Sequence, residues 1–196
     1  FISGNIFSVK YIYASGLSNE KNKIIINQIK NIKEKNIFRL KKDYFTKFIN
    51  RNDTKYLSIK KNYPNKLILD FIQAKPLCVI EIKDTKFVLG DNGKKLNTKI
   101  KSNNIPIVLG SDNLSEIFYT INLLKLSKFE YKKIKKIIFF KSGRFDVNLN
   151  NGVIVKFPIK YTKEIINYSH NLLNEKKFAN SKIIDLRIKN KIIKYE

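Results

Sequence analysis

The feature that most constrains the fold is a run bounded by two prolines, residues 58–78 (SIKKNYPNKLILDFIQAKPLC). Between Pro64 and Pro76, apolar residues recur at every second position, as in a strand with one apolar face. They are Leu67, Leu69 and Phe71. Because proline cannot donate to a strand ladder, the two prolines fix the borders of this strand. A second strand-like segment, at about 56–60, precedes Pro64. We therefore predict a β-hairpin closed around residues 63–65.

The residues before the hairpin predict one strand and two helices. Residues 6–13 are rich in β-branched and aromatic types and are typical of a strand. Ser18 is a good N-cap for a following helix, whose apolar stripe is Ile25, Ile29 and Ile32. A second helix is expected at about 41–51. The predicted order is β-α-α-β-β, and we expect it to form one domain over residues 6–75.

After Pro76 the sequence predicts mostly strands, in a second domain over residues 76–196. The expected strands are 77–83, 86–90, 134–140, 144–149, 153–157, 182–188 and 191–195. Asn-Gly turns at 91–93 and 150–152 favour tight hairpins. Two helices are expected, at about 113–126 and 162–175. The whole chain is thus predicted to be α+β, with a mostly antiparallel second domain.

The net charge of +24 raises the possibility of nucleic-acid binding. Arginine occurs only at 39, 51, 144 and 187, so 36 of the 40 basic residues are lysine. Recognition of bases and bidentate binding of phosphate favour arginine. The lysines are also dispersed among Ile and Asn, a mixture that A/T-rich codons encode. We attribute most of the charge to this bias, although a basic surface still favours acidic partners or anionic lipid.

The sequence offers little catalytic chemistry. His170 is the only histidine and Cys78 the only cysteine, so a metal site, a disulfide or a catalytic triad lacks partners. No Gly-rich phosphate loop is present. Asp185 and Arg187 can share a strand face and form an ion pair. We expect no enzymatic activity, no cofactor and no metal.

Without catalytic chemistry, the remaining interpretation is a protein module that binds a partner. We expect residues 189–195 to form a last strand at a sheet edge, where a strand from another chain can add. The alternative is that Lys189, Lys191 and Lys194 prevent such pairing, and the sequence alone leaves the two readings even.

The prolines and their neighbours resemble the end of the POTRA domain in the FtsQ/DivIB family of bacterial division proteins. Residues 59–78 correspond to the family pattern. That pattern is a hydrophobic residue, Arg, an aromatic residue followed by Pro, alternating Leu and Ile, Glu, and then Pro-Val-Ala. In this chain Lys60 replaces the Arg and Gln73 replaces the Glu. Four further segments follow in the family's order. They are 88–93 (VLGDNG), 105–110 (IPIVLG), 145–152 (FDVNLNNG) and 184–187 (IDLR).

The resemblance implies a POTRA domain followed by an FtsQ-type β domain, in a non-enzymatic scaffold of the divisome. It implies FtsB and FtsL as partners, bound by strand addition at the last strand. It also implies a single-pass inner-membrane protein at the division septum, with this portion on the periplasmic side. The chain contains no methionine and no apolar run of about 18 residues, so we expect a soluble piece of a longer product that has lost its membrane span.

By the same resemblance, the partner-binding residues are Arg187, Ile188, Asn190, Lys191, Ile193 and Tyr195. Arg187 would face an acidic side chain of the partner, and Tyr195 would approximate a terminal aromatic anchor. Ile188 stands at a usually aromatic position. Asn190 and Lys191 stand at positions that the family gives to a small polar residue and to glycine.

Two alternatives stay open. A POTRA module of an outer-membrane assembly or secretion protein would show further POTRA repeats or a long alternating barrel, and residues 76–196 show neither. A basic nucleic-acid-binding protein would cluster its lysines on one face beside stacking aromatic residues.

Overall fold

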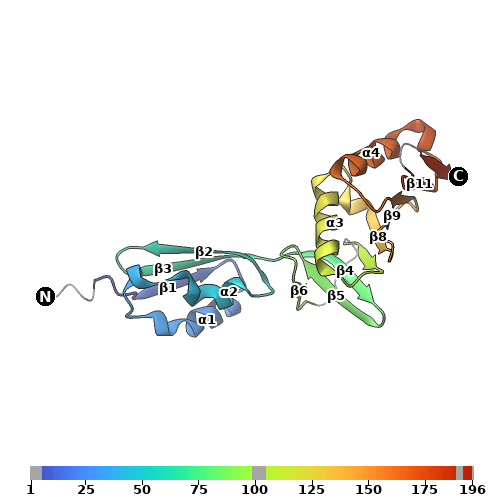
Figure 1. Cartoon of the computed structure of the whole chain (residues 1–196). Coiled ribbons are helices and arrows are strands. Elements are labelled where there is room, and N and C mark those ends of the chain that lie inside the picture. The colour runs from blue at the N-terminus through green and yellow to red at the C-terminus, as the bar shows by residue number, and fades with distance from the viewer. Residues whose placement is uncertain (1–5, 99–104, 189–191, 196) are drawn as a thin grey trace. The chain divides into compact units, whose positions relative to one another are not determined.

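The computed structural model describes residues 6–98, 105–188 and 192–195. The chain divides into two compact units, Phe1–Lys75 and Pro76–Glu196 (Figure 1). Within the described ranges, the first unit contains two α-helices and three strands, and the second contains two α-helices and nine strands. The α+β fold class predicted from the sequence is confirmed. None of the helices within the described ranges is long and apolar enough to cross a membrane.

The first unit is a three-stranded sheet covered on one face. Its strands are β1 (Tyr11–Ser15), β2 (Thr54–Asn62) and β3 (Lys66–Gln73), in the order β1-β3-β2. β1 runs parallel to β3 and β2 runs antiparallel to it, so the hairpin predicted around Pro64 is confirmed. The helices are α1 (Asn19–Gln28) and α2 (Thr46–Ile49), with 3₁₀ turns at Lys30–Ile32, Ile37–Arg39 and Lys42–Phe45. Leu67, Leu69 and Phe71 form the core with apolar residues of the helices and turns.

Two local predictions for this unit are wrong. The strand expected at 6–13 begins only at Tyr11, because the preceding segment bonds to residues 34–37 instead, as in the bond from the Ile37 N–H to the Phe7 carbonyl (2.9 Å). The helix expected at about 41–51 is a 3₁₀ turn followed by the short α2. Phe45 ends the 3₁₀ turn and Phe48 lies in α2, and both side chains are 1 % exposed, so the apolar side expected for one helix is divided between the two elements.

Lys60, which replaces the arginine of the family pattern, forms an ion pair within the three-stranded sheet. Lys60 lies 3.4 Å from Asp70 Oδ2 on the neighbouring strand. Asp70 in turn accepts a hydrogen bond from the Ser15 hydroxyl (2.7 Å), so the three strands are linked on this face. The carboxylate that pairs with Lys60 thus sits at position 70, three residues before Gln73.

The second unit is built on a nine-stranded sheet with the order β12-β11-β10-β9-β8-β7-β4-β5-β6. Its strands are β4 (Pro76–Ile82), β5 (Thr85–Gly90), β6 (Lys95–Leu96), β7 (Ile107–Leu109), β8 (Ile134–Phe139), β9 (Phe145–Leu149), β10 (Ile154–Phe157), β11 (Ile183–Asp185) and β12 (Ile193–Tyr195). Five of the eight neighbouring pairs are antiparallel. The helices are α3 (Leu114–Leu126) and α4 (Lys163–Asn174), and 3₁₀ turns occupy Tyr131–Lys133 and Lys176–Phe178.

One face of this sheet forms the core. A row of residues in direct cross-strand register is completely buried: Ile80, Val108, Ile137, Val147, Val155 and Ile184. Helices α3 and α4 supply the facing layer through Ile117, Ile121, Leu124, Ile166 and Leu172. The neighbouring residues along each strand point to the opposite face, because side chains alternate along a strand. That opposite face carries the charged side chains described below.

The last predicted strands are shorter than expected, and two strands were missed. β11 covers only three residues of the expected 182–188, because the Arg187 N–H bonds to the Asp185 side chain (3.0 Å) and turns the chain out of the ladder. β12 covers 193–195 of the expected 191–195, and Lys191 lies outside the described residues. The short strands β6 and β7 were not expected, since two or three residues carry too little alternation to identify a strand.

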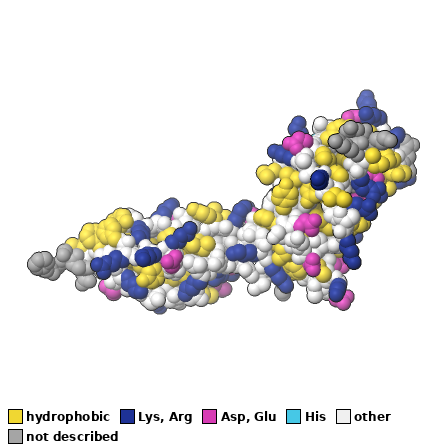
Figure 2. Space-filling view, in the orientation of Figure 1, with side chains coloured by type: hydrophobic (Ala, Val, Ile, Leu, Met, Phe, Trp, Pro, Cys, Tyr) yellow, Lys and Arg dark blue, Asp and Glu magenta, His cyan; other side chains and the backbone are white. Residues whose placement is uncertain are grey.

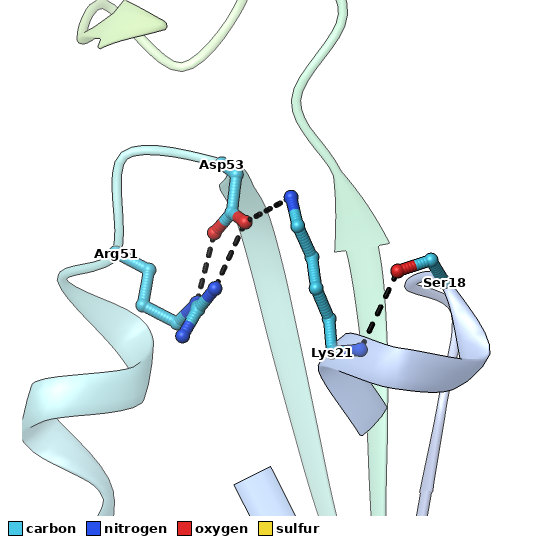
Figure 3. A network of polar contacts seen from close by, with 4 residues as sticks. All are labelled: Ser18, Lys21, Arg51 and Asp53. Atoms are coloured by element: carbon cyan, nitrogen blue, oxygen red, sulfur yellow. Dashed lines mark hydrogen bonds and ion pairs between the residues drawn. The ribbon is translucent and has the colours of Figure 1, made fainter. Parts of the chain in front are cut away.

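A network of polar contacts in the first unit links the start of α1 to the segment before β2 (Figure 3). Arg51 Nε and Nη2 donate to the two carboxylate oxygens of Asp53 at 2.8 and 2.9 Å, and Lys21 Nζ donates to Oδ2 at 2.8 Å. Lys21 also belongs to the first turn of α1, where its N–H donates to the Ser18 cap. The hydrogen bond from Arg51, with the help of Lys21, lowers the pKa of Asp53 from 3.8 to about 2. This carboxylate therefore joins α1 to the segment that enters β2.

We expect Asp53→Asn to destabilise the first unit by about 2 kcal/mol at neutral pH, the value that the pKa difference implies. The folded pKa lies below the ordinary value, so this stabilisation is complete above about pH 4 and is lost as the pH falls from 4 toward 2. Urea unfolding at pH 7 and pH 3 measures the difference between the variant and the parent. Asp43→Asn, which changes an exposed carboxylate of the same unit, is the control. A pH-independent difference would contradict the role of Asp53.

Candidate partner-binding edge

Strand β12 forms one edge of the nine-stranded sheet. Within the described part of the chain its only strand neighbour is β11, with Asp185 opposite Ile193 and Ile183 opposite Tyr195. Lys194 is exposed and the Tyr195 side chain is half-exposed. An edge strand presents N–H and C=O groups along its free side, to which another extended segment can bond. The geometry of this edge is therefore that of a strand acceptor.

Next to this edge, Asp185 and Arg187 form a side-on ion pair. Arg187 Nε lies 2.8 and 3.0 Å from the two carboxylate oxygens, and Nη2 bonds to Oδ2. Asp185 is 3 % exposed, whereas a third of the Arg187 side chain is exposed. The hydrogen bond from Arg187 lowers the pKa of Asp185. None of the bonds to Asp185 uses Nη1, so the outer part of the guanidinium can meet a second acceptor.

The pair continues a row of charges on the sheet face opposite the helices. Asp146 on β9, Lys156 on β10 and Asp185 on β11 stand directly opposite one another, and Ile193 of β12 ends the row. Desolvation raises the pKa of Asp146, against the opposing charges of Lys156, Arg187 and Arg144. The alternation of acid, base and acid stabilises neighbours across the strands.

Three polar atoms in or near this charged row are buried. Asp146 Oδ1, Arg144 Nε and Asn148 Oδ1 have no hydrogen-bond partner within the described ranges. A buried polar atom without a partner costs free energy, so this part of the sheet is less stable than a fully bonded one.

A groove opens beside the same edge, with a volume of about 1000 Å³. It is lined by the β8–β9 turn, the segment after β10, helix α4, residues 186–188 after β11 and Ile192 before β12. The lining residues are Ser142, Arg144, Pro158, Ile159, Lys160, Ile165, Tyr168, Leu186, Arg187, Ile188 and Ile192. Ile159 and Ile188 are 61 % and 50 % exposed, which leaves apolar surface in the groove. Two arginines at the border of an apolar groove suit a segment that carries both apolar and acidic side chains.

The residues named from the sequence fall into three groups. Arg187 and Ile188 line the groove, and Ile193 and Tyr195 belong to β12. Asn190 and Lys191 lie outside the described residues. Arg144 and Asp146 were not named as binding residues, although Arg144 is one of only four arginines in a lysine-rich chain, and that rarity was an available signal.

The structure also bears on the residues considered for metal binding and catalysis. Over the described ranges, no group of three or more His, Cys, Asp or Glu side chains could hold a metal ion. His170 lies in α4, where its Nε2 is 3.2 Å from Asn174 Nδ2. Cys78 is completely buried, and burial raises the pKa of its thiol to about 12.

Comparison with known proteins gives one consistent result. The chain is similar to the "Cell division protein FtsQ" of Rickettsia conorii (24 % identity), Rickettsia felis (25 %) and Rickettsia prowazekii (23 %). Each match extends over 191 residues, 94 % of this chain and 71 % of the relative. No family model matches. A solved structure of the major extracytoplasmic domain of the division protein DivIB from Geobacillus stearothermophilus is 18 % identical, with a TM-score of 0.41 over 51 % of this chain and 91 % of that one.

We expect Arg187→Ala to destabilise the second unit by about 2 kcal/mol, because it leaves Asp185 buried and uncompensated. The double variant Asp185→Asn/Arg187→Gln removes both charges and should recover most of that loss. Chemical unfolding of the parent, Asp185→Asn, Arg187→Gln and the double variant measures the coupling. Additive losses would show that the two side chains do not depend on each other.

Proposed function

Because the chain belongs to the FtsQ/DivIB family of bacterial cell division proteins, we propose that it is a non-enzymatic divisome scaffold that binds its partner at strand β12. FtsB, together with FtsL, is the proposed partner. The observation that supports this most directly is the place of β12 at the edge of the nine-stranded sheet, beside an apolar groove with two arginines.

The two units take two roles in this proposal. Residues 6–75 are assigned as the POTRA domain, on the order of their elements and the β1-β3-β2 sheet. Residues 76–196 are assigned as the FtsQ-type β domain that carries the binding edge. We place the protein at the division septum, as a single-pass inner-membrane protein with both units on the periplasmic side.

Strand addition uses backbone bonds for affinity and side chains for specificity. Ile193 and Tyr195 lie in register with Asp185 and Ile183, so their side chains share the sheet face that carries the charged row. A partner strand beside β12 would extend this face and lie next to Arg187. Its apolar side chains would enter the groove at Ile188, and an acidic side chain would meet the outer edge of the Arg187 guanidinium.

We expect Ile193→Pro to reduce the affinity for an FtsB-derived peptide by at least about tenfold, because proline removes a donor from β12 and distorts its ladder. Fluorescence anisotropy with a labelled peptide measures the affinity. Lys95→Pro, in the edge strand β6 at the other end of the same sheet, is the matched control and should bind as the parent does. If both variants are folded by circular dichroism and bind equally, strand addition at β12 is wrong.

The double variant Asp185→Asn/Arg187→Gln tests the side-chain contact separately. It removes the guanidinium without leaving a buried charge, so we expect a folded protein whose peptide affinity is several-fold lower and less dependent on salt. Charge reversal of Arg187 alone is less informative, since it would place a second carboxylate against Asp185. Unchanged affinity of the double variant at low salt would confine Arg187 to its structural role.

A further inference from the structure

A cluster of exposed aromatic side chains lies at the end of the first unit where the β2–β3 turn and the first described residues meet. We call Ile6, Phe7, Phe38 and Tyr63 the aromatic tip. The Phe38 ring lies 5.1 Å from Phe7 and stacks on Tyr63 at 4.7 Å between centroids. Despite these ring contacts, Ile6, Phe38 and Tyr63 keep 54 %, 56 % and 52 % of their surface exposed to solvent. Figure 2 shows hydrophobic side chains gathered at this end of the unit, with Lys and Arg beside them.

Backbone hydrogen bonds and buried residues fix the segments that carry the aromatic tip. The Ile37 N–H donates to the Phe7 carbonyl (2.9 Å), and the Val9 N–H donates to the Lys35 carbonyl (3.0 Å). Val9 and Ile37 are completely buried, so each of these two segments has an anchored residue close to its exposed aromatic side chain. The Lys10 N–H donates to the Asn65 carbonyl (2.9 Å), which ties in the β2–β3 turn. The aromatic rings are therefore displayed by three joined segments.

The same three segments carry a strong positive charge. Residues 6–10, 33–39 and 61–66 contain six basic residues and one acidic residue, Glu34. Five of the basic residues are lysine. Lys61 Nζ donates to the carbonyls of Phe38 (3.3 Å) and Leu40 (2.9 Å), which places one positive charge at the backbone of Phe38.

We propose that the aromatic tip is a contact site for an anionic lipid bilayer. Aromatic rings with polar surroundings favour the headgroup region of a membrane, and each nearby lysine adds electrostatic attraction to anionic lipid. Lysine supplies point charges without a fixed geometry, which suits a fluid array of headgroups, whereas protein hot spots are enriched in Arg, Trp and Tyr, of which the aromatic tip contains only Tyr63. The occupant that matches both the exposed rings and the lysines is thus a lipid surface.

The absence of tryptophan from the chain permits a direct measurement. Phe38→Trp places a single fluorophore in the tip, and Tyr119→Trp places one at a comparably exposed position (59 %) on α3. With vesicles of phosphatidylglycerol and phosphatidylethanolamine, we expect a blue shift and protection from acrylamide only for Phe38→Trp. Phosphatidylcholine vesicles should produce neither change. Equal responses at both positions, or no response at position 38, would overturn the proposal.

A charge comparison separates a specific site from the general attraction of a basic protein. The triple variant Lys10→Gln/Lys35→Gln/Lys66→Gln removes exposed charges around the tip, and Lys135→Gln/Lys163→Gln/Lys182→Gln removes three exposed charges from the second unit. In vesicle sedimentation we expect the tip variant to bind about tenfold or more weakly than the matched variant, because each lysine near the membrane contributes separately. Lys35→Gln also removes the contact of Lys35 Nζ with the Tyr44 ring (4.9 Å), so circular dichroism first checks that both variants are folded. Equal binding of the two would show that net charge alone, and not the tip, attracts the protein.

Discussion

The second unit depends on the burial of one apolar face of its sheet. Six residues in cross-strand register, from Ile80 to Ile184, are completely buried against α3 and α4. Apolar burial on this scale is the dominant favourable term in folding. Since the helices cover one face, the next residues along the same strands carry Asp146, Lys156 and Asp185 to the other face. The charged row beside the proposed binding edge is thus a direct consequence of where the helices pack.

The scarcity of arginine gives the few arginines a structural meaning. Arg51 and Arg187 each make side-on contacts to an aspartate two residues away, Asp53 and Asp185. Lysine cannot reproduce this geometry, because its ammonium is a point charge. Two of the four arginines, Arg51 and Arg187, thus supply the two bonds to one carboxylate that a lysine could not. A lysine suffices where a positive charge is needed but the direction of its hydrogen bonds is not fixed.

The sequence predicted the long elements well and the short ones poorly. The hairpin around Pro64 and helix α3 were predictable because proline borders and apolar periodicity extend over many residues. Strand β7 was not, since its three residues are defined by neighbours β4 and β8, which are distant in sequence. The same applies to the site: Asp185 and Arg187 are visible as a local pair, whereas Arg144 and Asp146 join them only through the pairing of β9, β10 and β11.

The two sequence-based readings of the last strand, as an acceptor or as a protected edge, are compatible once charge is considered. Lys194 stands opposite Ile184, and a charged side chain on the apolar side of an edge strand opposes pairing with an uncharged or basic strand. A second copy of this chain would bring the same lysine and a net charge of +24 to the contact, so self-pairing is repelled. An acidic strand would instead be attracted by Lys194 and by Arg187. If β12 accepts a partner strand as proposed, the same lysine would therefore favour an acidic one.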